Sequence, residues 1–223
     1  SNNFRISYSK NEVVDSVEKI EHSIVRNTLK YFNISEPLEI VSVADIPGHG
    51  TGLGSSSAFT CALIKALSLY KEKEISQIAT AKLAAHIEIN LCENPIGKQD
   101  QYGCALGGIK TIDFEACGQV RLSNLEPKLE SSLINNFINS CVLYYTGMTR
   151  SASSILESVS SKDNLQEKIV SLKNVKEQNQ TFYNALQKKD FKNIGETLNK
   201  NWSEKKNLAN TKNNNALDKM HNF

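Results

Sequence analysis

The stretch Asp45–Ala58 constrains this chain most, because it joins a predicted strand to a predicted helix through a glycine-rich turn. The alternating, β-branched residues 38–44 are typical of a strand, and the apolar run 58–67 is typical of a buried helix. Glycine permits positive φ and lets a ligand approach the main chain. The start of a helix adds unpaired N–H groups and partial positive charge. We therefore expect an anion site suited to phosphate.

The same turn has a simpler explanation, which is that it only connects the strand to the helix. It matches neither the G-x-G-x-x-G fingerprint nor the G-x-x-x-x-G-K-[ST] loop, because no lysine follows Gly54. A phosphate bound there would need a metal as its counter-charge. The hydroxyls of Ser55, Ser56 and Ser57 can cap the helix or hold such a metal, and carboxylates must supply the remaining charge.

Composition excludes several classes of function. Lys and Arg number 26 and Asp and Glu number 24, so the net charge of +2 gives little support to a nucleic-acid partner. No apolar run approaches the ~20 residues of a membrane span. The five cysteines are widely spaced, without a C-x-x-C pair, which disfavours zinc and indicates reduced thiols in the cytoplasm.

Residues upstream of the turn predict a strand and a long helix. Phe4–Tyr8 alternates like a strand. Ser9 and Glu12 match the S-x-x-E capping box, and an apolar stripe from Val13 to Phe32 predicts that one helix follows.

Downstream of the turn, two segments carry acids. A helix is predicted over residues 76–91, with Glu88 as the single charged group on a face of alanines. A buried carboxylate needs a partner or a cation; the alternatives are a Lys or Arg partner, or exposure to solvent. Asp100 follows Lys98, which can keep it ionised and able to accept a proton from a hydroxyl. This polar stretch can equally be a solvated loop.

The C-terminal half is predicted to begin with a hairpin, residues 109–114 and 119–122. A strand over residues 137–145 and two helices, from Leu165 and from Asp190, then follow. Arg150, after the expected strand, can bind a phosphate or form a surface salt bridge.

These segments resemble the GHMP kinases, the superfamily of galactokinase, homoserine kinase and mevalonate kinase. Four of them are similar to the branch of bacterial D-glycero-α-D-manno-heptose 7-phosphate kinases: FRISYSKNE (4–12), IPGHGTGLGSSSA (46–58), PIGKQDQYGCALGG (95–108) and YTGMTR (145–150). The resemblance covers nearly the whole chain. GLGSSSA is fairly specific to the superfamily, whereas GKQDQY together with YTGxxR is more specific to sugar kinases.

The resemblance implies a role for each matching position. Asp100 matches the family's catalytic aspartate, with Lys98 close to it in the sequence. Ser56 and Glu88 match the residues that bind Mg²⁺. The residues that match the ATP-phosphate turn are Gly50, Gly52, Leu53, Gly54, Ser55, Ser56 and Ser57. The residues that we assign to the sugar phosphate are Thr146, Gly147 and Arg150.

The resemblance also implies an α+β GHMP kinase fold. A ribosomal-S5-like N-terminal part is expected over residues 1–130 and an incomplete ferredoxin-like C-terminal part over residues 131–223. The implied reaction is ATP-dependent phosphorylation of the anomeric hydroxyl of heptose 7-phosphate to give the 1,7-bisphosphate, for GDP-heptose and surface polysaccharide. The alternatives are another GHMP small-molecule kinase or a non-catalytic sugar- or nucleotide-binding member.

The implied ligands are ATP, Mg²⁺ and a sugar phosphate, with a homodimer as one assembly. The superfamily's N-terminal R-I-x-F-x-G-G segment and its C-terminal glycine-rich motif are missing from the sequence. We therefore expect a chain truncated at both ends, whose isolated form can be inactive.

Overall fold

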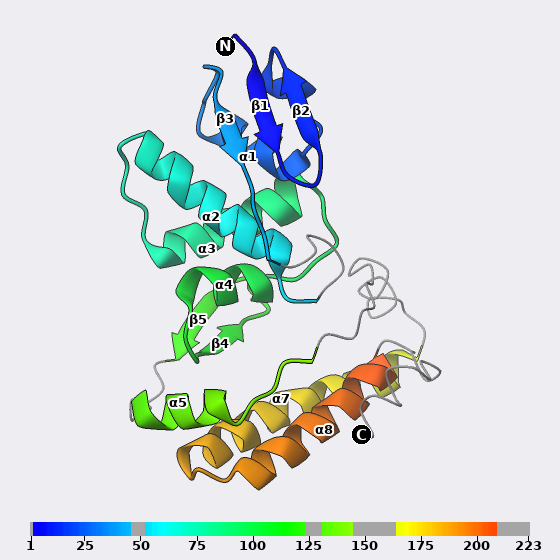
Figure 1. Ribbon diagram of the computed structural model, residues 1–223. Helices are drawn as coiled ribbons and strands as arrows, with labels where there is room; N and C mark the ends of the chain where they lie inside the picture. Colours follow the sequence, from blue (N-terminus) through cyan, green and yellow to red (C-terminus); the bar gives the residue numbers. More distant parts are fainter. Residues whose placement is uncertain (1, 46–51, 124–130, 145–163, 209–223) are drawn as a thin grey trace. The chain divides into compact units, whose positions relative to one another are not determined.

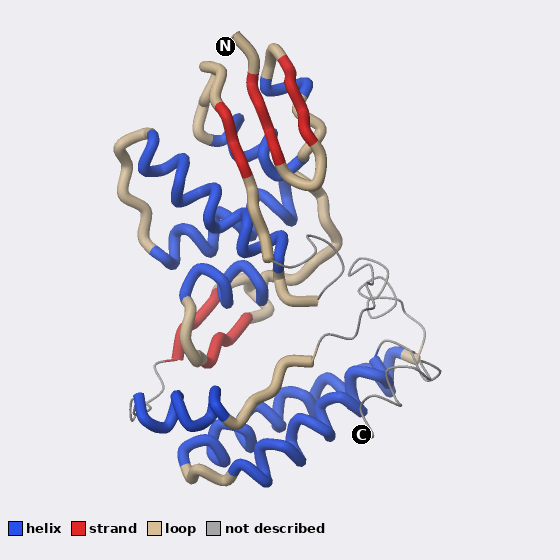
Figure 2. Tube along the Cα trace, in the orientation of Figure 1, coloured by secondary structure: helices blue, strands red, loops and turns tan. Residues whose placement is uncertain are grey.

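The structure is a computed structural model that describes residues 2–45, 52–123, 131–144 and 164–208. Its contacts divide the chain into two compact units, the first containing the chain up to Gly108 and the second beginning at Ile109. Helices and strands occur in both units, as the α+β class predicts (Figures 1 and 2).

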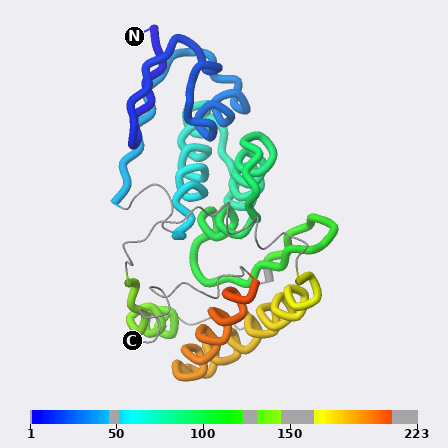
Figure 3. Tube along the Cα trace, turned by 90° about the vertical axis from the view of Figure 1, so that its right-hand side faces the viewer, coloured from blue at the N-terminus to red at the C-terminus, as the bar shows by residue number. Residues whose placement is uncertain are grey.

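The first unit contains a three-stranded sheet in the order β2-β1-β3 (Figure 2). Strand β1 (Phe4–Ser7) pairs antiparallel with β2 (Asn11–Val14) and parallel with β3 (Glu39–Val41). The strands predicted at Phe4–Tyr8 and within residues 38–44 are therefore confirmed. Figure 3 shows the helices of this unit on one face of the sheet.

The prediction of one helix that follows the Ser9 capping box is wrong for the first half of that segment. Residues 11–14 form β2 instead, a 3₁₀ turn η1 (Val17–Lys19) follows, and helix α1 (Ser23–Tyr31) begins only at Ser23. The Glu12 carboxylate accepts hydrogen bonds from the backbone N–H groups of Glu21 (2.6 Å) and His22 (3.1 Å). Glu12 thus satisfies amides at the start of α1, nine and ten residues downstream, which local spacing could not reveal.

The hydrophobic core of the first unit joins the sheet to the helices that carry the expected site. Helix α2 (Ser55–Tyr70) follows the glycine-rich turn, and α3 (Gln77–Ala85) packs against it. Phe4 and Ile6 of β1, Leu29 of α1 and Ile64 of α2 are among its buried members. Burial of this apolar surface holds the start of α2 in a fixed place.

The helix predicted over residues 76–91 exists but changes character at its end. Ser76 caps α3 by accepting a hydrogen bond from the Ala79 N–H at 3.2 Å. Residues His86–Leu91 then form a π-helix, η2, which is followed by α4 (Gln99–Leu106). The predicted alanine face is buried as far as Glu88, whereas Leu91 is 40% exposed. The wider π turn ends the regular spacing that placed Leu91 on that face.

The second unit contains a hairpin and three described helices. Strands β4 (Thr111–Phe114) and β5 (Val120–Ser123) pair antiparallel, which confirms the predicted hairpin. Helices α7 (Leu165–Gln187) and α8 (Phe191–Leu208) pack side by side, as predicted (Figure 1).

The strand predicted over residues 137–145 is wrong in its described part. Helix α5 (Ser131–Asn139) occupies the first residues, and residues 141–144 have no regular structure. Leu133 and Phe137 are four residues apart, so a helix brings them to one side; Leu133 is buried and the Phe137 ring meets Phe182 of α7 at 5.9 Å. The four-residue spacing of Leu133 and Phe137 therefore fits the helix α5 that forms here, and Leu133 lies upstream of the segment that was predicted to be a strand.

Candidate functional site

The end of the glycine-rich turn has the geometry expected of a phosphate-binding helix start. Gly52 and Gly54 have φ of +71° and +68°, and α2 begins directly after Gly54 without a side-chain cap on that residue. A side chain would be strained at either position. Ser56 is exposed in the first turn of α2, Ser55 is half-buried and Ser57 is buried, so the Ser56 side chain is the most accessible of the three. Leu53 is half exposed beside them.

The Asp100 side chain lies against Gly54. A Cβ placed on Gly54 would stand 3.5 Å from both the Cβ and the carboxyl carbon of Asp100 and 3.6 Å from its Oδ2. Asp100 is exposed in the first turn of α4 and Gly54 is the residue before α2. Two predicted site segments, 46 residues apart in the chain, therefore meet at one point, with a carboxylate beside the expected phosphate turn.

Glu88 lies in the π-helix η2 and is completely buried. Its Oε1 accepts a hydrogen bond from Gln101 Nε2 at 3.1 Å, and its Oε2 has no hydrogen-bond partner among the described residues. Neither a lysine nor an arginine of the described residues forms a salt bridge with it. Two of the alternatives for this residue, exposure and pairing with a cationic side chain, are therefore excluded within the described part of the chain.

A buried carboxylate oxygen without a partner fits a bound cation. Such an atom carries a large desolvation penalty unless something compensates it, and Mg²⁺ takes one or two carboxylates together with phosphate oxygens and waters. The described residues contain no group of three His, Cys, Asp or Glu that could hold a metal by themselves. Glu88 therefore supplies one carboxylate oxygen that a cation could use.

Two thiols lie close to these acids. The Cys104 Sγ lies 3.8 Å from the Gly54 carbonyl oxygen, and the Cys61 Sγ lies 3.6 Å from the Gln101 carbonyl oxygen. Burial raises the pKa of Cys61 to about 12, with smaller effects of Cys104 and Glu88. Burial, Asp100 and Glu88 also raise the pKa of Cys104. Both cysteines are thus neutral thiols near pH 7.

The other predicted site residues divide into two groups. Lys98 is exposed and stands immediately before α4, at its N-cap position. The segment Lys98–Gln101 is therefore the start of a helix, and the solvated-loop alternative is wrong for it. Gly50, Thr146, Gly147 and Arg150 lie outside the described residues.

Gln101 was missed as a site residue. It is fully buried and contacts Glu88, although it stands next to the exposed Asp100. The available signal was a polar residue between Asp100 and Tyr102 in a polar stretch, and that pattern alone does not distinguish a buried amide from an exposed one.

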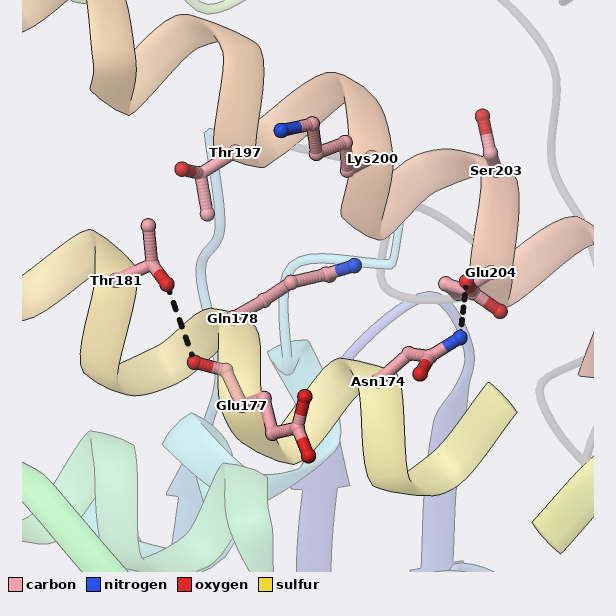
Figure 4. Close-up of a pocket in the computed structure, with 8 residues that line it drawn as sticks. All are labelled: Asn174, Glu177, Gln178, Thr181, Thr197, Lys200, Ser203 and Glu204. Carbon is pink, nitrogen blue, oxygen red and sulfur yellow. Dashed lines mark hydrogen bonds between the residues drawn. The ribbon is translucent and has the colours of Figure 1, made fainter. Parts of the chain in front are cut away.

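A second polar site lies in the other unit, between α7 and α8 (Figure 4). It has a volume of about 420 Å³, and Asn174 Nδ2 donates a hydrogen bond to Glu204 Oε1 across it at 2.8 Å. Its lining residues are Asn174, Glu177, Gln178, Thr181, Thr197, Lys200, Ser203 and Glu204. Sequence reasoning named none of these as functional.

Residues 18–108 match the family described as the GHMP kinases N terminal domain. The matched residues include α2, Glu88 and Asp100, so the described site lies within the matched segment.

Individual relatives extend the similarity beyond residues 18–108. A D-glycero-alpha-D-manno-heptose 7-phosphate kinase from Campylobacter jejuni is 27% identical over 210 residues, which are 93% of this chain and 60% of that protein. A homoserine kinase from Streptomyces coelicolor is 36% identical over 115 residues, 48% of this chain and 34% of that protein.

The crystal structure of a D-glycero-D-manno-heptose 1-phosphate kinase from Bacteroides thetaiotaomicron shares the fold. It has a TM-score of 0.67 and 23% identity, over 92% of this chain and 64% of that chain. The GHMP kinase fold is therefore confirmed. This chain spans less than two thirds of the first relative and of this structure. Within the described residues, no helix combines the length and the apolar character needed to cross a membrane.

Proposed function

We propose that this chain is the nucleotide-binding part, with an adjoining segment, of an ATP-dependent sugar kinase. The proposed reaction phosphorylates the anomeric hydroxyl of D-glycero-D-manno-heptose 7-phosphate and gives the 1,7-bisphosphate, for surface polysaccharide synthesis. The observation that carries the proposal is the Asp100 carboxylate packed against Gly54, at the start of α2. The five cysteines of the chain are all free thiols, which agrees with action in a reducing cytoplasm.

The residues of the glycine-rich turn would bind the triphosphate. Main-chain N–H groups at the start of α2, with Gly52, Gly54 and the Ser55 and Ser56 hydroxyls, offer donors where negative charge gathers. Phosphoryl transfer depends mainly on positioning and electrostatic stabilisation. The turn would therefore act by holding the γ-phosphate in line with the acceptor.

Asp100 would orient the acceptor hydroxyl and take its proton. The sugar oxygen forms a bond to the γ-phosphorus, the bond from that phosphorus to the bridging oxygen breaks, and ADP leaves. The hydroxyl proton passes to the Asp100 carboxylate. Lys98, two residues earlier and exposed, would adjust the electrostatics around that carboxylate or contact the γ-phosphate.

Glu88 and Ser56 would hold Mg²⁺. When bound, the cation offsets charge on the β- and γ-phosphates. The buried and unpartnered Oε2 of Glu88 supports this assignment. Thr146, Gly147 and Arg150, outside the described residues, remain our proposal for binding the 7-phosphate of the sugar.

A substrate panel tests the proposal. The longest natural polypeptide that contains this sequence would be assayed for ATP-dependent phosphorylation of heptose 7-phosphate, heptose 1-phosphate, L-fucose and homoserine. We expect the highest kcat/KM with heptose 7-phosphate. Turnover of another substrate alone would replace the proposed acceptor and keep the kinase activity. Binding of sugar or nucleotide without any turnover would establish the non-catalytic alternative.

A further inference from the structure

Gln101 connects the two acids of the proposed site. It follows Asp100 in the first turn of α4, is completely buried, and donates from Nε2 to Glu88 Oε1 at 3.1 Å. Glu88 belongs to a different element, η2. The same helical turn therefore presents Asp100 to solvent beside Gly54 and directs Gln101 inward to Glu88.

The hydrogen bond constrains the carboxylate without neutralising it. A carboxylate can rotate about its last bond, and an amide N–H donor on Oε1 fixes that rotation. The second oxygen, Oε2, is then left without a partner among the described residues. A lysine or arginine in place of Gln101 would compete with a cation for the charge of Glu88, whereas a neutral amide does not.

The position of Gln101 is itself fixed by its neighbours. Its backbone carbonyl lies 3.6 Å from the Cys61 Sγ of α2, and α4 packs against both α2 and α3. The Gln101 side chain therefore has little freedom to follow a displaced Glu88, and the pair behaves as one unit.

We propose that Gln101 is a positioning residue, which holds Oε1 of Glu88 so that Oε2 is directed to the nucleotide-bound cation. This inference rests on the proposed function, since it takes Glu88 to be the cation ligand. It adds a residue that touches neither ATP nor sugar, and it predicts that the binding of cation depends on the helix that carries Asp100.

Manganese binding tests the inference directly. Mn²⁺ would be titrated into the wild type and into Gln101→Met, each with a non-hydrolysable ATP analogue, and free Mn²⁺ would be followed by electron paramagnetic resonance. Methionine keeps a similar length without a donor. We expect Mn²⁺ affinity to fall about 10- to 100-fold, the range seen when a residue that orients a metal ligand is removed. Steady-state kinetics should show a raised KM for Mg²⁺ with a smaller change in kcat at saturating Mg²⁺.

The matched control is Gln99→Met, which makes the same change on the exposed side of the same helix. It should leave Mn²⁺ affinity within twofold of the wild type. Thermal melting without metal checks that each variant folds. Gln101→Asn, which keeps the amide but is one methylene too short for the contact, gives a second measurement should the methionine variant unfold.

A double-mutant cycle separates positioning from a general structural role. Once Glu88→Gln has removed the charged ligand, adding Gln101→Met should change Mn²⁺ affinity little, whereas a structural effect would add in full. Unchanged affinity in the single Gln101 variants, or full additivity in the cycle, overturns the inference alone. Absence of nucleotide-dependent Mn²⁺ binding in the wild type would instead remove the proposed cation role of Glu88 and the inference with it.

Discussion

Both units place polar side chains between packed helices, but they treat them differently. In the first unit the Glu88–Gln101 pair is completely buried, and one oxygen of each residue lacks a partner among the described residues. In the second unit Asn174 and Glu204 bond across an open, polar site between α7 and α8.

The difference is that solvent can satisfy the second site but not the first. Polar atoms at an open surface retain hydrogen bonds to water, so their arrangement does not imply a ligand. A carboxylate oxygen removed from water and left unpaired is unfavourable. It is therefore informative, because a bound cation, as proposed above, would compensate it. The comparison therefore favours the Glu88–Gln101 pair over the α7–α8 site as the place where a ligand binds, and the following substitutions test this difference.

The largest expected effect is on turnover in Asp100→Asn. Asparagine keeps the shape but cannot accept the hydroxyl proton, so kcat should fall by about 10²- to 10⁴-fold. Asp100 is exposed, so the melting temperature should stay near that of the wild type. The assay is ADP release with heptose 7-phosphate, and near-normal turnover would remove Asp100 from its catalytic role.

The next effect compares Glu88→Gln with Glu204→Gln. The first change removes the buried charge, so we expect a tenfold or greater rise in the Mg²⁺ concentration needed for half activity, with folding stability of the metal-free protein kept or increased. The second change, in the polar site between α7 and α8, should alter unfolding free energy by no more than about 0.5 kcal/mol and leave the Mg²⁺ requirement unchanged. Denaturant melts and Mg²⁺ titrations measure both. A strongly destabilised Glu88→Gln protein would show that the negative charge of Glu88 stabilises the metal-free fold.

The next prediction is a difference of several-fold between the rates at which two cysteines are labelled. Because the pKa of Cys104 is raised, its reactive thiolate is scarce near pH 8 and increases only as pH rises toward that pKa. Cys104 should therefore react with iodoacetamide more slowly than exposed Cys141, and ATP bound beside Gly54 should slow it further. Peptide mass spectrometry measures each site, and equal labelling rates at pH 8 would contradict the raised pKa of Cys104.

Alkaline stability follows from the second thiol. The pKa of Cys61 is raised to about 12 in the folded protein, above its unfolded value of ~8.5. Folding therefore opposes ionisation: the unfolding free energy is unaffected below about pH 8 and decreases as pH rises from there toward 12. Cys61→Ser should flatten this decrease in pH-dependent denaturant melts, and an unchanged slope would contradict the assignment.

The smallest effect separates strain from packing in the turn. Gly54→Ala places a Cβ at a φ of +68° and 3.5 Å from Asp100, so we expect a loss of stability of about 1 kcal/mol. Gly103→Ala, inside α4 with no atom within 4 Å of its new Cβ, should be neutral or stabilising by up to about 1 kcal/mol. Thermal melts of both variants give the comparison. A Gly54→Ala protein as stable as Gly103→Ala would show that the turn tolerates side chains.

Much of the fold was predictable because its signals are local. The helix after the glycine-rich turn, the hairpin and helices α7 and α8 were all indicated by periodicity and turn residues. The errors occurred where distant contacts outweighed local ones. Residues 11–14 pair with β1 while Glu12 bonds to amides before α1, and residues 131–139 form a helix whose Phe137 packs on Phe182.

The sequence by itself determined which residues can do chemistry here. It fixed a turn of glycines before a helix, one acid on a face of alanines, and another acid after a lysine, because residue type and spacing along one element require no knowledge of the rest. Tertiary structure alone decided their relations: Asp100 against Gly54, Gln101 on Glu88, and one Glu88 oxygen buried without a partner. Those relations depend on how α2, η2 and α4 pack, and packing is set by the whole core rather than by any one segment.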